Sequence, residues 1–572
     1  MGSSKGGRHG LARGLTNYGD PDFALYLRKS FAKSMGLSDA MLDRPVVGIC
    51  TSPSDLNNCH RHFPELIEAV KRGVLAGGAL PMAFPTISLG EVFLSPTSMF
   101  LRNLMSMDVE EMLRAQPLDA AVLVGGCDKT VPAQLMGAVS ADIPAVQLVA
   151  GPMMTGRLAG ERLGACTDCR RFWARYRAGD IDRAAIDRIE GRLAVTAGTC
   201  AVMGTASTMA CIAEALGMAL PGSAAIPAVH ADRLRCAEAS GFLAARMAVA
   251  GGPRPSTIIT PETVENALRV LLALSGSTNA LVHLTAIAGR RGIGIDLHRL
   301  NELSDTTPVL VDLKPTGAGY MEDFHAAGGL EAVLRELAPL LHLDVPTITG
   351  ESLRERLARP PAEPVDRAVI RPLESPLAPA GGLVALFGSL APRGAILKRA
   401  AATLALLEHE GRAVVFEGLE DLARRIDDPT LDVTPADVLV LKNAGPASPA
   451  AMPEAGYLPI PTKLARAGVK DMVRISDARM SGTAFGTVVL HVAPDAASGG
   501  PLALVQNGDR IRLSVRERRL DLLVPEAELG RRRAVWRPPA LPERGYARLW
   551  AEQILQAPEG CDFAFLRPSG PA

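Results

Sequence analysis

The feature that most constrains the fold is an apolar run, residues 120–124 (AAVLV), that leads directly into the octapeptide 125–132 (GGCDKTVP). Such a run is typical of a strand buried on both faces of a parallel sheet. The two glycines allow a tight turn, so a thiol, a carboxylate and an amine should emerge together at the strand's carboxyl end, where ligands bind in open α/β sheets. A soft ligand beside a hard one favours two adjacent metals. A strand-to-helix turn with a buried cysteine and a solvated ion pair explains the octapeptide equally well.

The totals exclude several classes of protein. A chain of 572 residues is too long for one hydrophobic core, so two or more domains are expected. Its 48% hydrophobic and 21% charged residues are typical of a soluble globular protein. Lys and Arg total 61, as do Asp and Glu, so nothing in the charge balance indicates a nucleic-acid or acidic-membrane partner.

Targeting and redox signals indicate a cytoplasmic protein. Residues 1–10 are polar and basic and contain no apolar core of a secretory signal. The most apolar long stretch, residues 269–289, is interrupted by serines, an asparagine and a histidine, which predicts a buried helix rather than a membrane span. Nine scattered cysteines do not form a disulfide framework, so we expect reduced thiols.

The periodicity predicts an α/β protein with two domains. Strand-like runs at 45–50, 79–85, 120–124 and 193–197 alternate with helical segments, which favours a mainly parallel sheet in an N-terminal α/β domain, residues 1–375. The proline-rich segment from about 345 to 380 is the expected linker. Short apolar runs separated by turns then predict a C-terminal β-barrel-like domain flanked by helices, residues 376–572.

Three cysteines share one context, because Cys59, Cys127 and Cys200 each lie in a loop after a strand-like run. Parallel strands would bring these loops to one edge of the sheet. Three thiolates suit either zinc or an iron–sulfur cluster, and a three-cysteine set leaves one metal position open for Lewis-acid catalysis. Cys200 also precedes a predicted helix, 205–220, whose amino-terminal dipole would stabilise a thiolate.

The remaining cysteines are interpreted as structural. Cys166-Thr167-Asp168-Cys169 is a CxxC motif, which suggests zinc or redox chemistry. It has neither a second CxxC nor a convincing histidine partner nearby, and polar, charged residues surround it. We therefore interpret this motif as a plain surface loop.

Longer motifs resemble a known family, the iron–sulfur dihydroxy-acid and sugar-acid dehydratases. The resemblance runs from about residue 16 to 530. Within the family, the chain is most similar to the sugar-acid (L-arabinonate or pentonate) branch. Its motifs lie at residues 54–60, 125–138, 197–218, 275–280, 313–317, 320–323, 388–398, 438–446, 452–454 and 475–487.

The resemblance implies two metal groups. Cys59, Cys127 and Cys200 match the ligands of a cluster, which is 2Fe–2S in the sugar-acid branch. The carboxylates that match magnesium ligands are Glu91, Asp128 and Glu454, and Lys129 matches a lysine that is carbamylated in the family. A carbamate makes physical sense there, because an ammonium repels a metal and a carbamate adds an oxygen anion. The loop 447–451 before Glu454 is poorer in glycine than the family pattern.

The resemblance also implies the reaction. A 2,3-dihydroxy carboxylate would bind Mg²⁺ through its carboxylate and 2-hydroxyl, and the open iron would take the 3-hydroxyl. Ser481 matches the family's base, which removes the proton on carbon 2, and Thr483 is a candidate substrate-binding residue. The product is a 2-keto-3-deoxy acid. Without the resemblance, Ser481 reads as a turn residue in a glycine-rich loop.

We therefore expect a hydro-lyase that acts on an aldonic acid such as L-arabinonate or D-xylonate. Two alternatives stay open: a dihydroxy-acid dehydratase of branched-chain amino-acid synthesis and a non-catalytic iron–sulfur sensor. The family resemblance also implies a homodimer or homotetramer, with no nucleic-acid or membrane partner.

Overall fold

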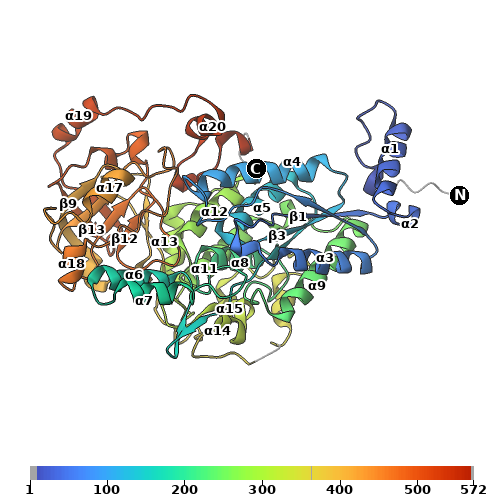
Figure 1. Ribbon diagram of the computed structural model, residues 1–572, viewed down its shortest axis with the longest axis horizontal. Coiled ribbons are helices and arrows are strands. Elements are labelled where there is room, and N and C mark those ends of the chain that lie inside the picture. The colour runs from blue at the N-terminus through green and yellow to red at the C-terminus, as the bar shows by residue number, and fades with distance from the viewer. Residues whose placement is uncertain (1–8, 362–363, 569–572) are drawn as a thin grey trace.

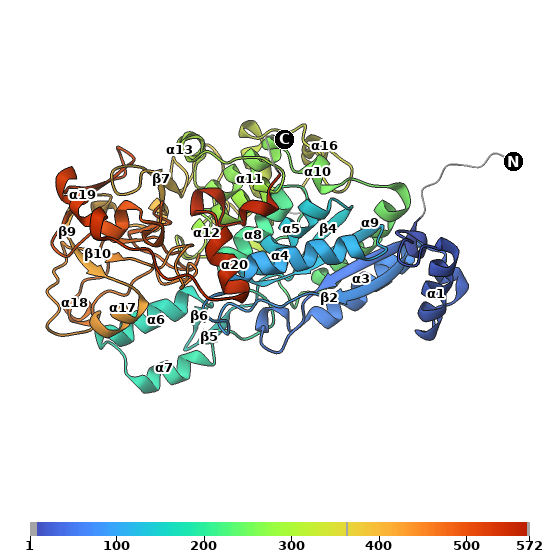
Figure 2. The ribbon, with the colours of Figure 1, turned by 90° about the horizontal axis from the view of Figure 1, so that it is seen from above.

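A computed structural model describes residues 9–361 and 364–568. Figures 1 and 2 show two parts side by side, one blue to yellow in the first two thirds of the chain and one orange to red in the last third. The first part contains a parallel sheet with helices on both faces, and the second a barrel-like sheet. The predicted fold class is therefore confirmed, whereas the exact domain boundaries stay a prediction.

The N-terminal sheet has the strand order β2-β1-β3-β4, and every neighbouring pair is parallel. Its strands are β1 (Val46–Thr51), β2 (Leu80–Pro85), β3 (Ala120–Gly125) and β4 (Ala145–Val149). Successive side chains of a strand point to opposite faces. Val122 and Val124 pack with α3 (Phe63–Ala76) and α9 (Ala231–Ala250), and Ala121 and Leu123 with α4 (Ser98–Ala115) and α5 (Cys127–Ala141). Apolar runs without alternation result, as observed at 120–124.

The predicted strand at 193–197 is wrong. In the described structure these residues form turns and bends, and only the isolated parallel bridge between Thr199 and Pro152 follows them. Pro152 comes three residues after β4, so the bridge still delivers the next loop to the same edge of the sheet. The run does not pack within the sheet, because Leu193 joins two small clusters beside it and Val195 is exposed.

Residues 269–289 are buried and helical, as predicted, but they belong to two helices. These are α11 (Pro261–Ala273) and α12 (Thr278–Gly289), which a turn at 274–277 separates. Every residue of α12 is buried. Within the described ranges, none of the helices combines the length and apolar character that crossing a membrane requires.

The proline-rich segment 345–380 is not an extended connector in its described residues. It contains the short helix α16 (Leu353–Ala358), and Ile370 and Ala378 form β-bridges to Val311 and Val309. Residues 362–363 lie outside the described structure. The segment is therefore fastened along the N-terminal part.

The C-terminal sheet has the order β14-β13-β9-β10-β11-β12-β8-β7. It closes through Phe387, which follows β7 and bridges Arg519 of β14, with Leu520 N donating to Phe387 O at 2.8 Å. The strands are β7 (Val384–Leu386), β8 (Ala395–Leu397), β9 (Glu408–Phe416), β10 (Val438–Leu441), β11 (Arg474–Ser476), β12 (Val488–Leu490), β13 (Arg510–Ser514) and β14 (Arg519–Leu522). Closure leaves no free sheet edge at this seam.

The end of the chain returns to the N-terminal part. Helix α20 (Gly545–Gln553) lies beside α4 in both views (Figures 1 and 2), where Tyr546 OH accepts from Leu104 N at 3.1 Å. Arg290 and Asp562 form a fully buried ion pair with an Nε–Oδ2 distance of 2.6 Å. The two parts are thus joined by contacts far apart in sequence.

Candidate active site

The octapeptide 125–132 joins β3 to α5, but not in the way the glycines suggested. Cys127 itself adopts the left-handed conformation, with φ of 62°, and α5 begins at this residue. Pro132 lies inside the helix, in its second turn. The thiol, carboxylate and amine therefore emerge from the first turn of a helix, where the helix dipole favours negative charge.

The two glycines are required for close packing. A Cβ on Gly125 would lie 2.3 Å from Oε1 of Gln134, and one on Gly126 would lie 2.6 Å from the Cβ of Ala150. Neither glycine has a positive φ. Because these residues have no side chain, the end of β3 and the start of α5 can pack closely against their neighbours.

The three predicted cysteines come together. Cys59 lies in the short helix η2 (Asn58–His60) after β1, and Cys127 and Cys200 follow β3 and the Thr199 bridge. A hydrogen bond with Cys59, followed by burial, raises the pKa of the Cys127 thiol. The nearby charges of Cys59 and Cys127 also help to raise the pKa of Cys200, after a hydrogen bond with Cys166 and burial. Four thiols therefore interact directly or electrostatically.

The CxxC motif is not a plain surface loop, so that interpretation is wrong. Sγ of Cys166 lies 3.3 Å from Sγ of Cys200, and Asp168 is fully buried. The sequence carried a signal, the CxxC itself, but its partner is 34 residues away along the chain. Sequence spacing alone did not reveal that pairing.

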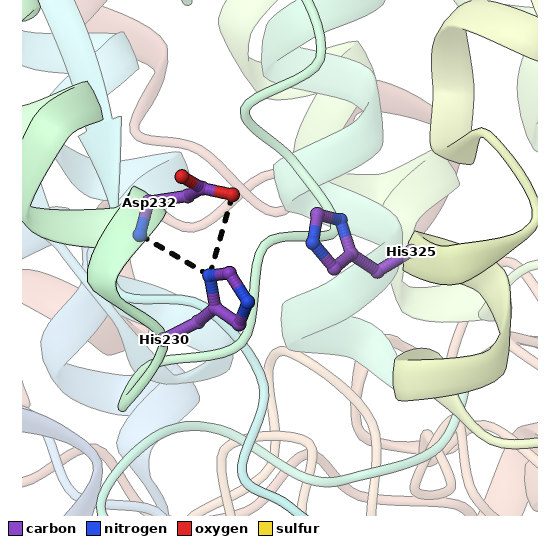
Figure 3. Close-up of side chains that lie close together, drawn as sticks. All are labelled: His230, Asp232 and His325. Atoms are coloured by element: carbon purple, nitrogen blue, oxygen red, sulfur yellow. Dashed lines mark hydrogen bonds and ion pairs between the residues drawn. The ribbon is translucent and has the colours of Figure 1, made fainter. Parts of the chain in front are cut away.

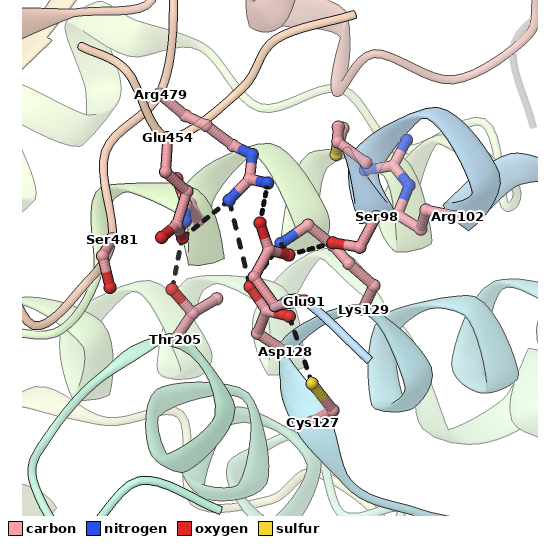
Figure 4. Close-up of polar contacts among 12 residues, drawn as sticks. Glu91, Ser98, Arg102, Cys127, Asp128, Lys129, Thr205, Glu454, Arg479 and Ser481 are labelled. Carbon is pink, nitrogen blue, oxygen red and sulfur yellow. Dashed lines mark hydrogen bonds and ion pairs between the residues drawn. The ribbon is translucent and has the colours of Figure 1, made fainter. Parts of the chain in front are cut away.

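The three predicted carboxylates also converge (Figure 4). One oxygen each from Glu91, Asp128 and Glu454 lies within 4.8 Å of the other two. Nζ of Lys129 lies 2.5 Å from Oδ2 of Asp128 and 3.6 Å from Oε2 of Glu91, and its side chain is fully buried. Cys127 Sγ lies 3.6 Å from Oδ1 of Asp128. The set of cysteines and the set of carboxylates are therefore in contact.

Arg479 is a site residue that the sequence reasoning missed. Its buried guanidinium donates from Nη2 to Oε1 of Glu91 at 2.6 Å and from Nη1 to Oε1 of Glu454 at 2.8 Å. Its Nε also donates to the backbone carbonyl of Met452 at 2.8 Å, which holds the loop that carries Glu454. The available signal was an arginine within the apolar and small residues of 475–487, two positions before Ser481.

The surroundings shift the pKa values of Glu91 and Glu454 in opposite directions. Burial opposes the ionisation of Glu91, but the charges of Arg479 and Lys129 outweigh it and hold the pKa of Glu91 below its ordinary value. Burial and the negative charge of Glu91 raise the pKa of Glu454 to about 7. A divalent cation among these carboxylates would add positive charge and favour the ionised form of Glu454.

Ser481 lies at the seam between the two parts. Its Oγ is 2.8 Å from Oγ1 of Thr483, and Figure 4 shows it facing the same space as Glu454. A Cβ on Gly482 would lie 2.6 Å from the Cβ of Ser277 and 2.7 Å from the backbone N of Thr205. The glycine therefore allows the serine loop of the C-terminal part to rest directly on two helix starts of the N-terminal part.

A second group of possible ligands lies apart from this site. His230, Asp232 and His325 place ligand atoms within 4.8 Å of one another (Figure 3). Nδ1 of the exposed His230 accepts from the backbone N of Asp232 at 3.1 Å, and the Asp232 carboxylate pairs with Arg235. Helix capping and an ion pair explain these contacts, so we assign the group no role.

Comparison with known proteins decides the family. The N-terminal model of the dihydroxy-acid/6-phosphogluconate dehydratases matches residues 44–356, and the C-terminal model matches residues 368–561. The chain belongs to the dihydroxy-acid/6-phosphogluconate dehydratase family. The resemblance noted from the motifs is thereby confirmed, and the protein is an enzyme of the hydro-lyase class.

Individual relatives of this dehydratase cover nearly its whole length. It is 48% identical to the L-arabonate dehydratase of Azospirillum brasilense over 560 residues, 96% of each chain. It is 46% identical to the 6-deoxy-6-sulfo-D-gluconate dehydratase of Pseudomonas putida over 533 residues, 92% of each chain. Identity to the dihydroxy-acid dehydratase of Carboxydothermus hydrogenoformans is 38% over 514 residues, 88% of this chain and 92% of the relative.

Proposed function

We propose that this dehydratase removes water from an aldonic acid, such as L-arabinonate or D-xylonate, to give a 2-keto-3-deoxy acid. The observation that carries the proposal is the contact between a cluster of cysteines and a cluster of carboxylates. They meet at the start of α5, where Cys127 and Asp128 are adjacent. The higher identity to sugar-acid dehydratases, 46–48% against 38%, favours an aldonate over a branched-chain substrate.

The cluster of cysteines suits the ligand set of an iron–sulfur cluster. Cys59, Cys127 and Cys200 are near one another, and burial disfavours free thiolates at Cys127 and Cys200. Iron would provide the positive charge that these sulfurs lack. We assign the three cysteines as ligands of a 2Fe–2S cluster.

The carboxylate group fits Mg²⁺, which prefers oxygen ligands in octahedral geometry. Glu91, Asp128 and Glu454 provide three such oxygens, and a cation there would favour the ionised form of Glu454. Lys129 would serve best as a carbamate, because its nitrogen points directly at Asp128 and an ammonium there would repel the metal. The guanidinium of Arg479 then holds the carboxylates of Glu91 and Glu454 in position by hydrogen bonds.

When bound, the cluster would supply Lewis acidity toward the 3-hydroxyl, and Mg²⁺ would supply it toward the carboxylate and 2-hydroxyl, which would acidify the proton on carbon 2. Oγ of Ser481, as an alkoxide, accepts that proton, and the bond from carbon 3 to its hydroxyl breaks to give the enol. Ser481 then passes the proton to the departing hydroxide, so that water leaves and the alkoxide is restored. The enol then tautomerises to the 2-keto acid. Thr483 lies at hydrogen-bond distance from Ser481 and orients its Oγ toward the substrate.

The test is a substrate panel with anaerobically purified protein. Aldonates of five and six carbons and 2,3-dihydroxyisovalerate are incubated separately, and 2-keto products are trapped and quantified. We expect turnover of at least one aldonate, and turnover of 2,3-dihydroxyisovalerate alone would establish the branched-chain alternative. Iron, sulfide and magnesium are measured on the same sample.

Two further properties belong to the proposal. We place the enzyme in the cytoplasm because its cysteines form no disulfide framework, and we infer a homodimer or homotetramer from the family resemblance. The charge balance favours no nucleic-acid or membrane partner. Light scattering on the purified protein measures the oligomeric state.

A further inference from the structure

The sulfur of Cys166 occupies a specific place beside the proposed cluster ligands. Its distance of 3.3 Å from Sγ of Cys200 is far longer than a disulfide bond of about 2.05 Å. Two thiolates on one tetrahedral metal ion, each about 2.3 Å from it, lie about 3.8 Å apart. The observed separation is therefore close to that of two ligands of the same metal ion.

The four thiols form two pairs. Cys59 and Cys127 follow the adjacent parallel strands β1 and β3 and form one pair, and Cys166 and Cys200, whose sulfurs lie 3.3 Å apart, form the second. A 2Fe–2S cluster with protein ligands at every position takes two cysteines on each iron. The pairing therefore matches a complete ligand set, one cysteine more than the three that the family resemblance assigns.

The position of Cys166 is built into the fold. The carbonyl of Ala165 accepts from the backbone N of Ala201 at 3.0 Å, which aligns the two cysteine-bearing segments. Next to it, the buried carboxylate of Asp168 accepts from Gly164 N at 2.8 Å and from Tyr320 OH at 2.8 Å. A segment held on both sides of the cysteine keeps the thiol in reach of Cys200.

The same segment also touches the serine loop. Oγ1 of Thr167 donates to the carbonyl of Thr483 at 3.0 Å, two residues from Ser481. Cys166 thus lies between the ligand Cys200 and the loop of the proposed base.

The surroundings of Cys166 suit a thiolate that can leave a metal. It is the N-cap of α6 (Thr167–Ala178), where the helix dipole favours negative charge, and Arg170 lies near. Cys169, in the first turn of the same helix, packs in the same small cluster of side chains as Cys166 and Cys200. Cys166 therefore has a second stabilised position available.

We propose that Cys166 is a fourth, displaceable thiolate ligand of the iron–sulfur cluster, on the iron that Cys200 holds. This inference rests on the proposed function. Without substrate the thiolate closes the open position; when a substrate hydroxyl enters, the thiolate moves toward Cys169 and the start of α6. One sulfur ligand is exchanged for one oxygen ligand, so no electrons are transferred and no oxidant is needed.

The test uses the anaerobic holoenzyme and compares Cys166→Ala and Cys166→Ser with the wild type. Cys169→Ser is the neighbouring control, and Cys236→Ser in α9 is the distant one. Electron paramagnetic resonance of the reduced cluster, visible circular dichroism and iron content are recorded with and without L-arabinonate. The rate at which the cluster bleaches in air is measured on the same samples.

We expect both Cys166 variants to keep their iron but to change the resonance and dichroism of the resting cluster, whereas Cys236→Ser matches the wild type. Bleaching in air should become about tenfold faster in Cys166→Ala, the scale on which a lost metal contact acts. Adding L-arabinonate should change the wild-type spectrum. With L-arabinonate bound, the spectra of the wild type and Cys166→Ala should be the same.

Resting spectra and bleaching rates that are the same in Cys166→Ala and wild type would overturn the inference while leaving the proposed function intact. Wild-type protein without iron and sulfide would instead overturn the proposed function, and the inference with it. If Cys166→Ala does not assemble a cluster, the serine variant decides, because an oxygen ligand on iron shifts the spectrum and a merely structural residue does not.

Discussion

Nη2 of Arg479 lies 2.6 Å from Oε1 of Glu91, although 388 residues separate the two along the chain. This contact joins the barrel to the loop after β2 and orders the carboxylates of the proposed magnesium site. Because the guanidinium is buried, breaking the pair would leave an uncompensated charge in the interior.

We predict that Arg479→Gln lowers kcat/KM by about 100-fold, because Glu91 and Glu454 lose the group that fixes their positions. Steady-state kinetics and magnesium content measure the effect. The control is Arg177→Gln, which removes a surface pair to Asp427 that also joins the two parts of the chain. Equal losses in both variants would assign Arg479 a role in joining the parts rather than in the site.

A second prediction concerns the close contact at the serine loop. Gly482→Ala would place a Cβ 2.6 Å from Ser277 and displace Ser481, so we expect kcat to fall by about 100-fold. Gly530→Ala in α19 (Glu526–Val535) is the matched control, because a Cβ there meets no atom within 4 Å. Wild-type kcat in Gly482→Ala would show that the loop tolerates displacement.

The third prediction concerns Lys398, which is 1% exposed and whose Nζ has no hydrogen-bond partner in the described structure. Burial lowers its pKa to about 7, so folding disfavours the ammonium wherever the unfolded chain carries it. The penalty is full below pH 7 and vanishes above the unfolded value of about 10.5. Lys398→Met should therefore raise the melting temperature at pH 7 and have a smaller effect at pH 10.

The matched control for this change is Lys442→Met. Lys442 is also buried, but its Nζ donates to Glu417 Oε1 at 2.9 Å and to the carbonyl of Ala503 at 3.2 Å. Scanning calorimetry should show a lower melting temperature for this variant. If Lys398→Met also destabilises the protein at pH 7, Lys398 has a charged partner in solution.

A fourth prediction follows from His62, which is 9% exposed and whose Nε2 lies 2.9 Å from the carbonyl of Ala150. Burial lowers its pKa to about 4 from the ordinary 6.5. Above pH 6.5 the histidine is neutral in both states and has no effect; below it the unfolded chain gains a proton that the native state refuses. Stability is therefore lost between pH 6.5 and 4, by about 3 kcal/mol at most.

His62→Gln keeps a donor for the Ala150 carbonyl and removes this titration. Melting temperatures measured from pH 7 to pH 5 should fall less steeply in the variant than in the wild type. Parallel curves would mean that His62 titrates normally in the folded protein.

Local sequence was enough to predict the sheet strands at 45–50, 79–85 and 120–124. It also grouped Cys59, Cys127 and Cys200 by their shared place after strand-like runs, whereas the three carboxylates were nominated by the family resemblance; the structure brings each set together. These features depend on short-range properties, since apolar runs, turn residues and long motifs can be recognised within a few neighbours.

Other features depend on which distant segments pack together. The run at 193–197 has the composition of a strand but lies beside the sheet, and Cys166 meets Cys200 only because the backbones of Ala165 and Ala201 are hydrogen-bonded. Arg479 joins the site only when the barrel docks on the N-terminal part. Burial and hydrogen bonding between segments tens to hundreds of residues apart decide such contacts, and no local pattern encodes them.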